Sequence, residues 1–319
     1  MTDDTLRSAQ EAVSLGDWEG AAKQLRRAAA EAAARGEAQR AAHCEQMVSS
    51  LYRAAGSMEE SLAAAARVAG RAKESPRARF AAEAERAETL FAAGKFADAC
   101  QAWQEAIHEA DKLDLPDTPR ATVVRRHALC LAHAGQLEAA WAAFDAAATL
   151  MTNSGIEHAV AWVDIEHAQV ACDIREISEV RHVLARDRVA QAASEDDHLR
   201  AQMHCVRAAC ALVDHDAVTA RVEATAAREA ALLAVAPVAY FAAAVRLSQA
   251  ADLLGDRLEA YRALATAWGT LSDLLGEPVA RSWVEPVLLA LQWQWGEEAF
   301  TAVRTEHDRQ RRIDLGYKA

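Results

Sequence analysis

The sequence is poor in the residues that form strands and turns. Among its 319 residues, glycine occurs 13 times, proline six times and asparagine once, and aromatic residues make up 6%. Strand-rich folds need β-branched and aromatic residues together with residues that form turns. Alanine, which has the highest helix propensity, occurs 80 times. We therefore predict an all-α protein.

Positive charge and long apolar runs are also scarce. The chain carries 47 acidic and 35 basic residues, a net charge of −12, and its only basic cluster is the stretch Arg309-Gln310-Arg311-Arg312. A nucleic-acid-binding surface needs a basic stripe, so we predict no nucleic acid partner. No run of about 18 apolar residues occurs and the N-terminus is acidic, so we predict no membrane partner and no export signal.

The six cysteines form no C-x-x-C pair and no regular framework. In a chain of this length that pattern is typical of reduced thiols, and it predicts a cytoplasmic protein. Lysine occurs five times against 30 arginines, and this bias, together with the alanine excess, indicates GC-rich coding and a bacterial source.

Motifs that carry chemistry are absent from the sequence. It has no phosphate-binding glycine loop, no Gly-x-Ser-x-Gly and no His-Glu-x-x-His. The spacing His127-x-x-Cys130-x-x-His133 is the nearest to a metal site, but on one helix the outer pair is turned by about 120°, so we interpret these as packing residues. We predict no catalytic site, metal or cofactor, and an enzyme or enzyme subunit is the least favoured class.

A short pattern recurs along the whole chain. It consists of glycine or a replacement, an apolar residue, an acidic residue and a small residue, as in Gly94-Lys-Phe-Ala-Asp-Ala99. The copies follow one another at intervals of 38 to 41 residues and start at Gly16, Gly56, Gly94, Gly135, Arg175, His215, Gly255 and Gly296. The residues seven before and five after each start are almost uniformly small, for example Ala87, Ala128, Ala140 and Ala260.

These columns predict antiparallel helix pairs, each helix about 16–18 residues long. Glycine ends the first helix in the left-handed conformation, and the following acidic residue suits the N-terminus of the second helix. Small residues stand where the two helices cross closely. Because glycine is lost at Arg175 and His215, we expect distorted turns there.

The turn pattern and the small-residue columns resemble the tetratricopeptide repeat (TPR), over about residues 3–313. The period is longer than the usual one and resembles the long-helix TPR-like regions of some bacterial regulators. The resemblance implies a right-handed α-solenoid of about eight antiparallel helix pairs in one domain, residues 1–319, with the last helix as a polar cap. The expected units are 3–36, 37–75, 76–117, 118–155, 156–195, 196–236, 237–277 and 278–319.

A TPR superhelix binds partners on the concave surface, which the first helix of each pair lines. Carried over position by position, the resemblance implies a partner-binding groove here. Its residues are Arg53, Glu88, Phe91, Arg125, Leu129, His133, Trp162, Gln169, Gln202, Leu212, Gln249, Trp283 and Trp293, with His43, Gln46 and Ser50 beside the first of them. The asparagine-based carboxylate clamp is missing, because the one asparagine, Asn153, is predicted in a loop.

The expected function is a protein-interaction scaffold that binds a peptide or a partner helix in this groove. A regulatory sensor that responds to a peptide or small ligand and acts through a separate effector is the alternative. The convex surface of second helices is an alternative binding face, and the oligomeric state is left open.

Overall fold

The computed structural model describes residues 3–14, 17–71 and 76–314, and this part of the chain is all-α, as the composition predicts. Two compact units comprise Met1–Val163 and Asp164–Ala319. The first unit holds α1 (Asp3–Ser14), α2 (Trp18–Ala34), α3 (Ala38–Ala54), α4 (Met58–Arg71), α5 (Pro76–Ala92), α6 (Phe96–Lys112), α7 (Asp117–His133) and α8 (Leu137–Asn153). The boundary between the units falls within α9 (Glu157–Asp173).

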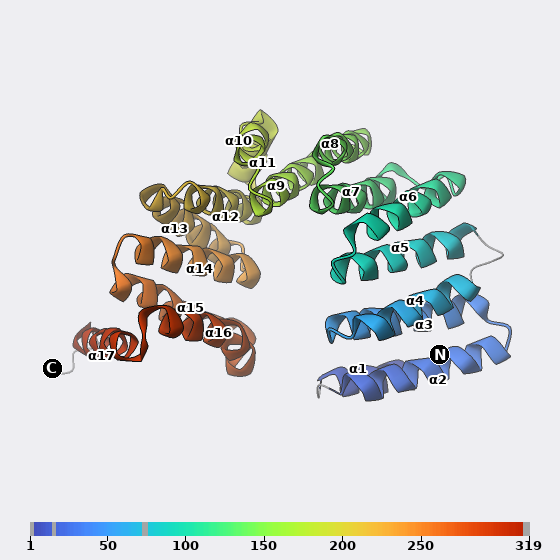
Figure 1. Ribbon diagram of the computed structural model, residues 1–319, viewed down its shortest axis with the longest axis horizontal. Coiled ribbons are helices and arrows are strands. Elements are labelled where there is room, and N and C mark those ends of the chain that lie inside the picture. Colours follow the sequence, from blue (N-terminus) through green and yellow to red (C-terminus); the bar gives the residue numbers. More distant parts are fainter. Residues whose placement is uncertain (1–2, 15–16, 72–75, 315–319) are drawn as a thin grey trace. The chain divides into compact units, whose positions relative to one another are not determined.

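The second unit has the same kind of architecture. It holds α10 (Ile177–Leu184), α11 (Asp187–Glu195), α12 (Asp197–Val213), α13 (Ala217–Leu233), α14 (Pro237–Leu253), α15 (Arg257–Leu275), α16 (Glu277–Trp295) and α17 (Glu297–Asp314). In each unit, helices that follow one another along the chain pack side by side, as α5 and α6 or α12 and α13 do (Figure 1). The fold is therefore a solenoid of helix hairpins, as predicted. Whether all the hairpins form one continuous array stays a prediction.

The turns inside the hairpins have the predicted left-handed residue. Gly135 and Gly255 have φ of 77° and 80°. The next amide donates back to the end of the first helix, from Gln136 N to Leu131 O at 2.9 Å and from Asp256 N to Ala251 O at 2.9 Å. This pattern satisfies carbonyl groups that the helix end leaves without a partner. Gly16 lies outside the described residues.

The prediction of distorted turns at Arg175 and His215 is wrong. Both residues adopt the left-handed conformation, with φ of 67° and 59°. The hydrogen bond that closes the glycine turns also forms here, for example from Asp216 N to Ala211 O at 2.9 Å. Packing of the flanking helices therefore imposes the conformation although these side chains disfavour it.

The prediction of two long helices in every unit is wrong for the fifth unit. Its second helix is broken at Ala185-Arg186 into the short helices α10 and α11. The buried carboxylate of Asp164 on α9 holds the segment after the break, accepting from Arg186 at 2.6 Å and from Arg188 at 2.5 and 2.8 Å. Asp187 begins α11, where an acidic side chain favours a helix N-terminus.

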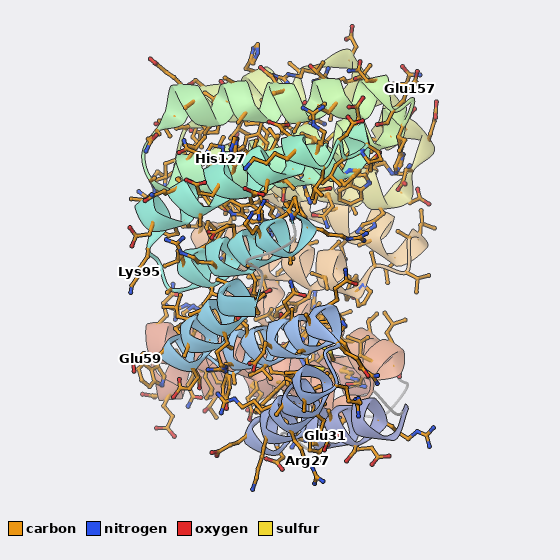
Figure 2. All side chains as sticks on the ribbon, turned by 90° about the vertical axis from the view of Figure 1, so that its right-hand side faces the viewer. Arg27, Glu31, Glu59, Lys95, His127 and Glu157 are labelled. Carbon is orange, nitrogen blue, oxygen red and sulfur yellow. The ribbon has the colours of Figure 1, made fainter. Side chains whose placement is uncertain are left out.

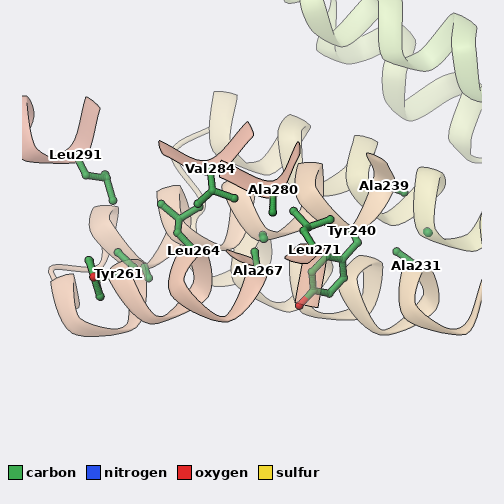
Figure 3. Packing of buried hydrophobic residues seen from close by; sticks show 14 of the residues in the cluster. Ala231, Ala239, Tyr240, Tyr261, Leu264, Ala267, Leu271, Ala280, Val284 and Leu291 are labelled. Carbon is green, nitrogen blue, oxygen red and sulfur yellow. The ribbon is translucent and has the colours of Figure 1, made fainter. Parts of the chain in front are cut away.

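The small-residue columns lie in the interior, as the register predicts. Ala87, Ala128, Ala140 and Ala260 are fully buried. The large side chains that follow on the second helices, Leu25, Trp103, Phe144, Leu184 and Leu264, are buried as well. In the second unit, Tyr240, Leu264, Leu271 and Val284 meet between α14, α15 and α16 (Figure 3). Alanine thus lets the helices approach, and larger residues fill the space between neighbouring hairpins.

The outer faces of the helices are charged. On α2, Arg27 and Glu31 form an exposed ion pair at 3.0 Å. Figure 2 shows both side chains at the outside of the first unit, and Glu59 and Lys95, which follow successive turns, along one edge of it. None of the helices in the described part of the chain is long and apolar enough to cross a membrane.

The last hairpin departs from the others. Single residues, Gly276 and Gly296, join α15 to α16 and α16 to α17, and both have φ near 85° with ψ near 150° instead of the tight helical turn. The buried part of α17 is limited to Phe300, and α17 packs along α15 as well as α16. That α17 acts as a polar cap stays a prediction.

Candidate functional site

An apolar pocket lies on the first helices of the first three hairpins. Its volume is about 540 Å³. The lining residues are Ala9 and Val13 of α1, Leu25 of α2, His43, Gln46, Met47, Ser50 and Leu51 of α3, and Glu85 of α5. All of the pocket belongs to the first unit.

Sequence reasoning found part of this pocket and missed its apolar floor. His43, Gln46 and Ser50 were predicted as lining residues, and they do line the pocket. Met47 and Leu51 were not predicted. They lie four residues apart on α3, and this spacing places two apolar side chains on one helix face, a signal that the sequence contains.

The predicted residue Arg53 donates to two residues that line the pocket, Glu85 and Ser50. Its guanidinium donates to Glu85 at 2.7 Å and to Thr89 at 3.1 Å, and it thereby links α3 to α5. Its side chain is 23% exposed and that of Glu85 is 12% exposed, so the pair is largely removed from water. Arg53 is therefore held beside the pocket, and its charge is already neutralised by a carboxylate.

Beneath Arg53 lies a buried cluster of three hydroxyl groups. Ser49 and Ser61, two members of the small-residue columns, lie 3.0 Å apart, and Ser61 lies 3.1 Å from Thr89. Since each hydroxyl both donates and accepts, the three groups satisfy one another inside the hairpin stack. They hold the floor under Arg53 rigid.

Two other predicted residues, Phe91 and His133, meet in an aromatic cluster with Phe96. The ring centroids of Phe91 and His133 are 5.3 Å apart, and those of Phe96 and His133 are 5.1 Å apart. Phe96 is the apolar residue of the turn pattern and was not predicted as a site residue. The cluster joins α5 to α7 at the turn end of both helices.

The remaining predicted residues of the first unit lie on α5, α7 and α9. Glu88 pairs with Arg126 at 3.3 Å. Arg125, Leu129 and Trp162 are half-buried. The structure thus places Arg53, Glu88 and Phe91 on neighbouring helices with Arg125, Leu129 and His133, and their binding of a partner stays a prediction.

The predicted residues of the second unit have unlike surroundings. Gln169 donates to Asp173 of its own helix at 2.7 Å, and Leu212 packs against a buried alanine cluster. Gln202 is half-buried and Gln249 is exposed. The two tryptophans diverge, as Trp283 packs on Phe241 with ring centroids 5.6 Å apart while Trp293 is 89% exposed. Their binding of a partner stays a prediction.

The cysteine thiols are poorly suited to chemistry. All six are free and buried. Burial raises the pKa of Cys130 to about 12 and that of Cys172 to about 11. Burial also lowers the pKa of His127, which favours its neutral form. No group of three or more metal-ligating side chains occurs among residues 3–14, 17–71 and 76–314.

Comparison with known proteins defines the fold and leaves the family open. No family model and no curated protein matches the chain. Its fold is similar to the crystal structure of BtubC (BKLC) from P. vanneervenii, with 16% identity, a TM-score of 0.51, and 69% of this chain and 92% of that chain covered. It is also similar to aspartyl phosphate phosphatase F from Bacillus subtilis, with 12% identity and a TM-score of 0.55. The match covers 84% of this chain and 69% of that chain.

A third similar structure is decisive for the repeat type. This is the signal transduction ATPase with numerous domains (STAND) with a tetratricopeptide repeat sensor from Pyrococcus horikoshii, with 16% identity, a TM-score of 0.57 and 89% of this chain covered. The chain has a TPR-like fold. It spans 44% of the length of the STAND protein, and identities this low relate these TPR-like chains by fold alone.

Proposed function

We propose that this TPR-like protein is an interaction scaffold that binds a peptide or a partner helix on the first helices of its first unit. The apolar pocket of about 540 Å³ on α1, α3 and α5 carries the proposal. Anchor pockets with an apolar floor and a polar rim are the usual means by which a helix or peptide is held.

The pocket has the chemistry for one apolar anchor. Val13, Met47 and Leu51 offer an apolar floor, and methionine adapts to the shape of a guest side chain. At the rim, His43 and Ser50 are exposed and offer hydrogen bonds. The Arg53–Glu85 pair leaves no net charge at this end, so we propose a leucine, methionine or phenylalanine of the partner as the anchor.

Filling the pocket tests this function. Ser50→Trp places a large side chain into the pocket from its rim without removing any buried group, and Gln39→Trp on the exposed side of the same helix is the matched control. We expect a stoichiometric protein partner, identified by affinity capture and mass spectrometry, to be retained by the wild type and by Gln39→Trp and lost by Ser50→Trp. Equal retention by all three chains contradicts the proposal.

A sensor that acts through a separate effector is the second candidate function. It is favoured by the pocket volume, which falls within the roughly 300–1,000 Å³ of small-molecule sites. A small molecule or free peptide that co-purifies with the chain and is displaced by Ser50→Trp, with no protein partner, supports this candidate over the first. Both candidates include the proposal that the chain has no catalytic activity of its own. They also include a reducing, cytoplasmic compartment, which the free thiols support.

A further inference from the structure

A cleft in the second unit has no lining residue in common with the pocket of the proposed function. It has a volume of about 840 Å³ and is bounded by α15, α16 and α17. In a regular hairpin the second helix fills the space beside the first, but α17 buries only Phe300. The last hairpin is therefore open on one side, and the cleft lies where its two helices separate.

The dimensions of the cleft match a short helix. Its lining runs from Tyr261 to Thr270 along α15, which corresponds to about 13 Å of helix axis. A helix about 10 Å across rises about 5.4 Å per turn, so two turns occupy roughly 850 Å³. The cleft is thus at least as long as two turns of a helix and has a similar volume.

The walls of the cleft are chemically unequal. Leu288 and Leu289 of α16 form an apolar wall, and Phe300 with Tyr261 forms an apolar base, their ring centroids 5.6 Å apart. Leu289 is about half exposed although it lies in the cleft. Such a side chain on the inner wall of a hairpin is normally covered by the second helix.

The opposite wall, on α17, carries two arginines and two aspartates. Arg304 and Arg311 lie seven residues apart and so lie on the same face of the helix, with His307 between them. Within the described residues neither guanidinium forms an ion pair, whereas Arg262 is already held by Glu259 and Gln310.

Acidic residues line the cleft at three places. Asp308 lies 3.3 Å from the ring of its neighbour His307, and Asp314 stands at the end of α17. Glu285 belongs to the α16 wall. On the α17 wall, Arg304 and Arg311 therefore lie on either side of the His307–Asp308 pair, while Glu285 lies on the α16 wall.

We propose that this cleft binds a short amphipathic helix of a partner protein, with its apolar face on Leu288, Leu289 and Phe300 and acidic side chains opposite Arg304 and Arg311. Guanidinium groups bind carboxylates through paired hydrogen bonds, and the apolar face of an amphipathic helix is complementary to a groove of this kind. The site is a second one, independent of the pocket on α1, α3 and α5.

The test uses two labelled probe peptides and fluorescence polarisation on the full chain. One peptide carries leucine at positions i, i+3, i+4 and i+7 with glutamate on both flanks, and the other carries lysine in place of glutamate. We expect the glutamate peptide to bind at least about ten-fold more tightly than the lysine peptide, with an affinity that falls as salt is raised. Equal affinities for the two peptides overturn the proposal.

Variants of α17 locate the binding site. Arg304→Glu with Arg311→Glu is expected to weaken binding of the glutamate peptide at least about ten-fold. Arg312→Glu, a single charge reversal on the same helix outside the cleft, is expected to weaken it less than about two-fold. If the double variant loses helicity by circular dichroism, Arg304→Gln with Arg311→Gln replaces it, with an expected loss of about three- to ten-fold. An equal loss in Arg312→Glu overturns the proposal.

Two further outcomes separate this site from its alternatives. Ser50→Trp, which fills the other pocket, is expected to leave the peptide affinity unchanged. Loss in Ser50→Trp with none in the α17 variants refutes the cleft and supports the proposed function alone. A concentration-dependent dimer seen by light scattering, and lost in Arg304→Glu with Arg311→Glu, assigns the cleft to a second copy of the chain and also overturns the proposal.

Discussion

At the scale of single residues, the buried carboxylate of Asp164 decides the local structure of the fifth hairpin. It is 1% exposed, and two arginines from the segment after the helix break bind it. A buried carboxylate is costly unless its oxygens are satisfied, so the break and the two arginines belong together. The ion pair Arg181–Asp214 is exposed to water, so it contributes much less to the free energy of unfolding.

Asp164→Ala is therefore expected to destabilise the protein by about 2 kcal/mol, since it leaves Arg186 and Arg188 without their shared partner. Urea denaturation followed by circular dichroism measures the loss. Asp214→Ala, which removes an exposed partner, is the control with an expected cost below about 1 kcal/mol. Equal costs for the two substitutions contradict the role of Asp164.

At the scale of the helix and its ends, the turns hold residues in the strained left-handed backbone conformation. Val235, between α13 and α14, has φ of 50°, a conformation that branched side chains rarely adopt. Val235 is 67% exposed, so packing of its side chain offsets little of this cost. Other turns place glycine at such positions, as Gly36 and Gly155 do.

Val235→Gly is expected to stabilise the protein by about 0.5 kcal/mol, because relief of left-handed strain outweighs the entropy that glycine adds to the unfolded chain. Val222→Gly, in the middle of α13 and similarly exposed, is the matched control and is expected to destabilise by about 0.5 kcal/mol. Thermal unfolding compares the two. A loss of stability in Val235→Gly of the same size as in Val222→Gly refutes the strain at this turn.

At the scale of the whole molecule, the buried residues that the structure describes are divided among several clusters. The chain divides into two compact units, and the buried residues form separate clusters between neighbouring hairpins. In such arrays stability is close to a sum of the hairpins and their nearest-neighbour interfaces. A substitution in one hairpin is then expected to destabilise mainly that hairpin and its immediate neighbours.

Leu264→Ala in the second unit and Leu25→Ala in the first test this locality with the same chemical change. Both side chains are fully buried, and each substitution is expected to cost about 3 kcal/mol. Hydrogen exchange measured by mass spectrometry is expected to accelerate in α14–α16 for Leu264→Ala and in α1–α4 for Leu25→Ala. Exchange that accelerates equally in both units for either variant contradicts the array description.

The sequence predicted the fold better than it predicted the site. The turn glycines and small-residue columns are short-range signals, and they located hairpins whose members are adjacent in the chain. For the site, Gln46 and Ser50 were predicted in the pocket, whereas Met47 and Leu51 were missed, because a register borrowed from a shorter repeat assigns positions without side-chain packing. The ion pair of Arg53 with Glu85 joins two hairpins, and no pattern of neighbouring residues in the sequence predicts it.

By itself, the sequence determined the all-α class, the 40-residue period and the burial of the alanine columns, because each follows from helix propensity and from contacts between neighbours in the chain. Only the tertiary structure decided where the period fails. It shows left-handed turns without glycine at Arg175 and His215, a second helix broken beside Asp164, and a last hairpin that stays open. Each of these depends on side chains from different helices, whose meeting is a property of packing and not of spacing.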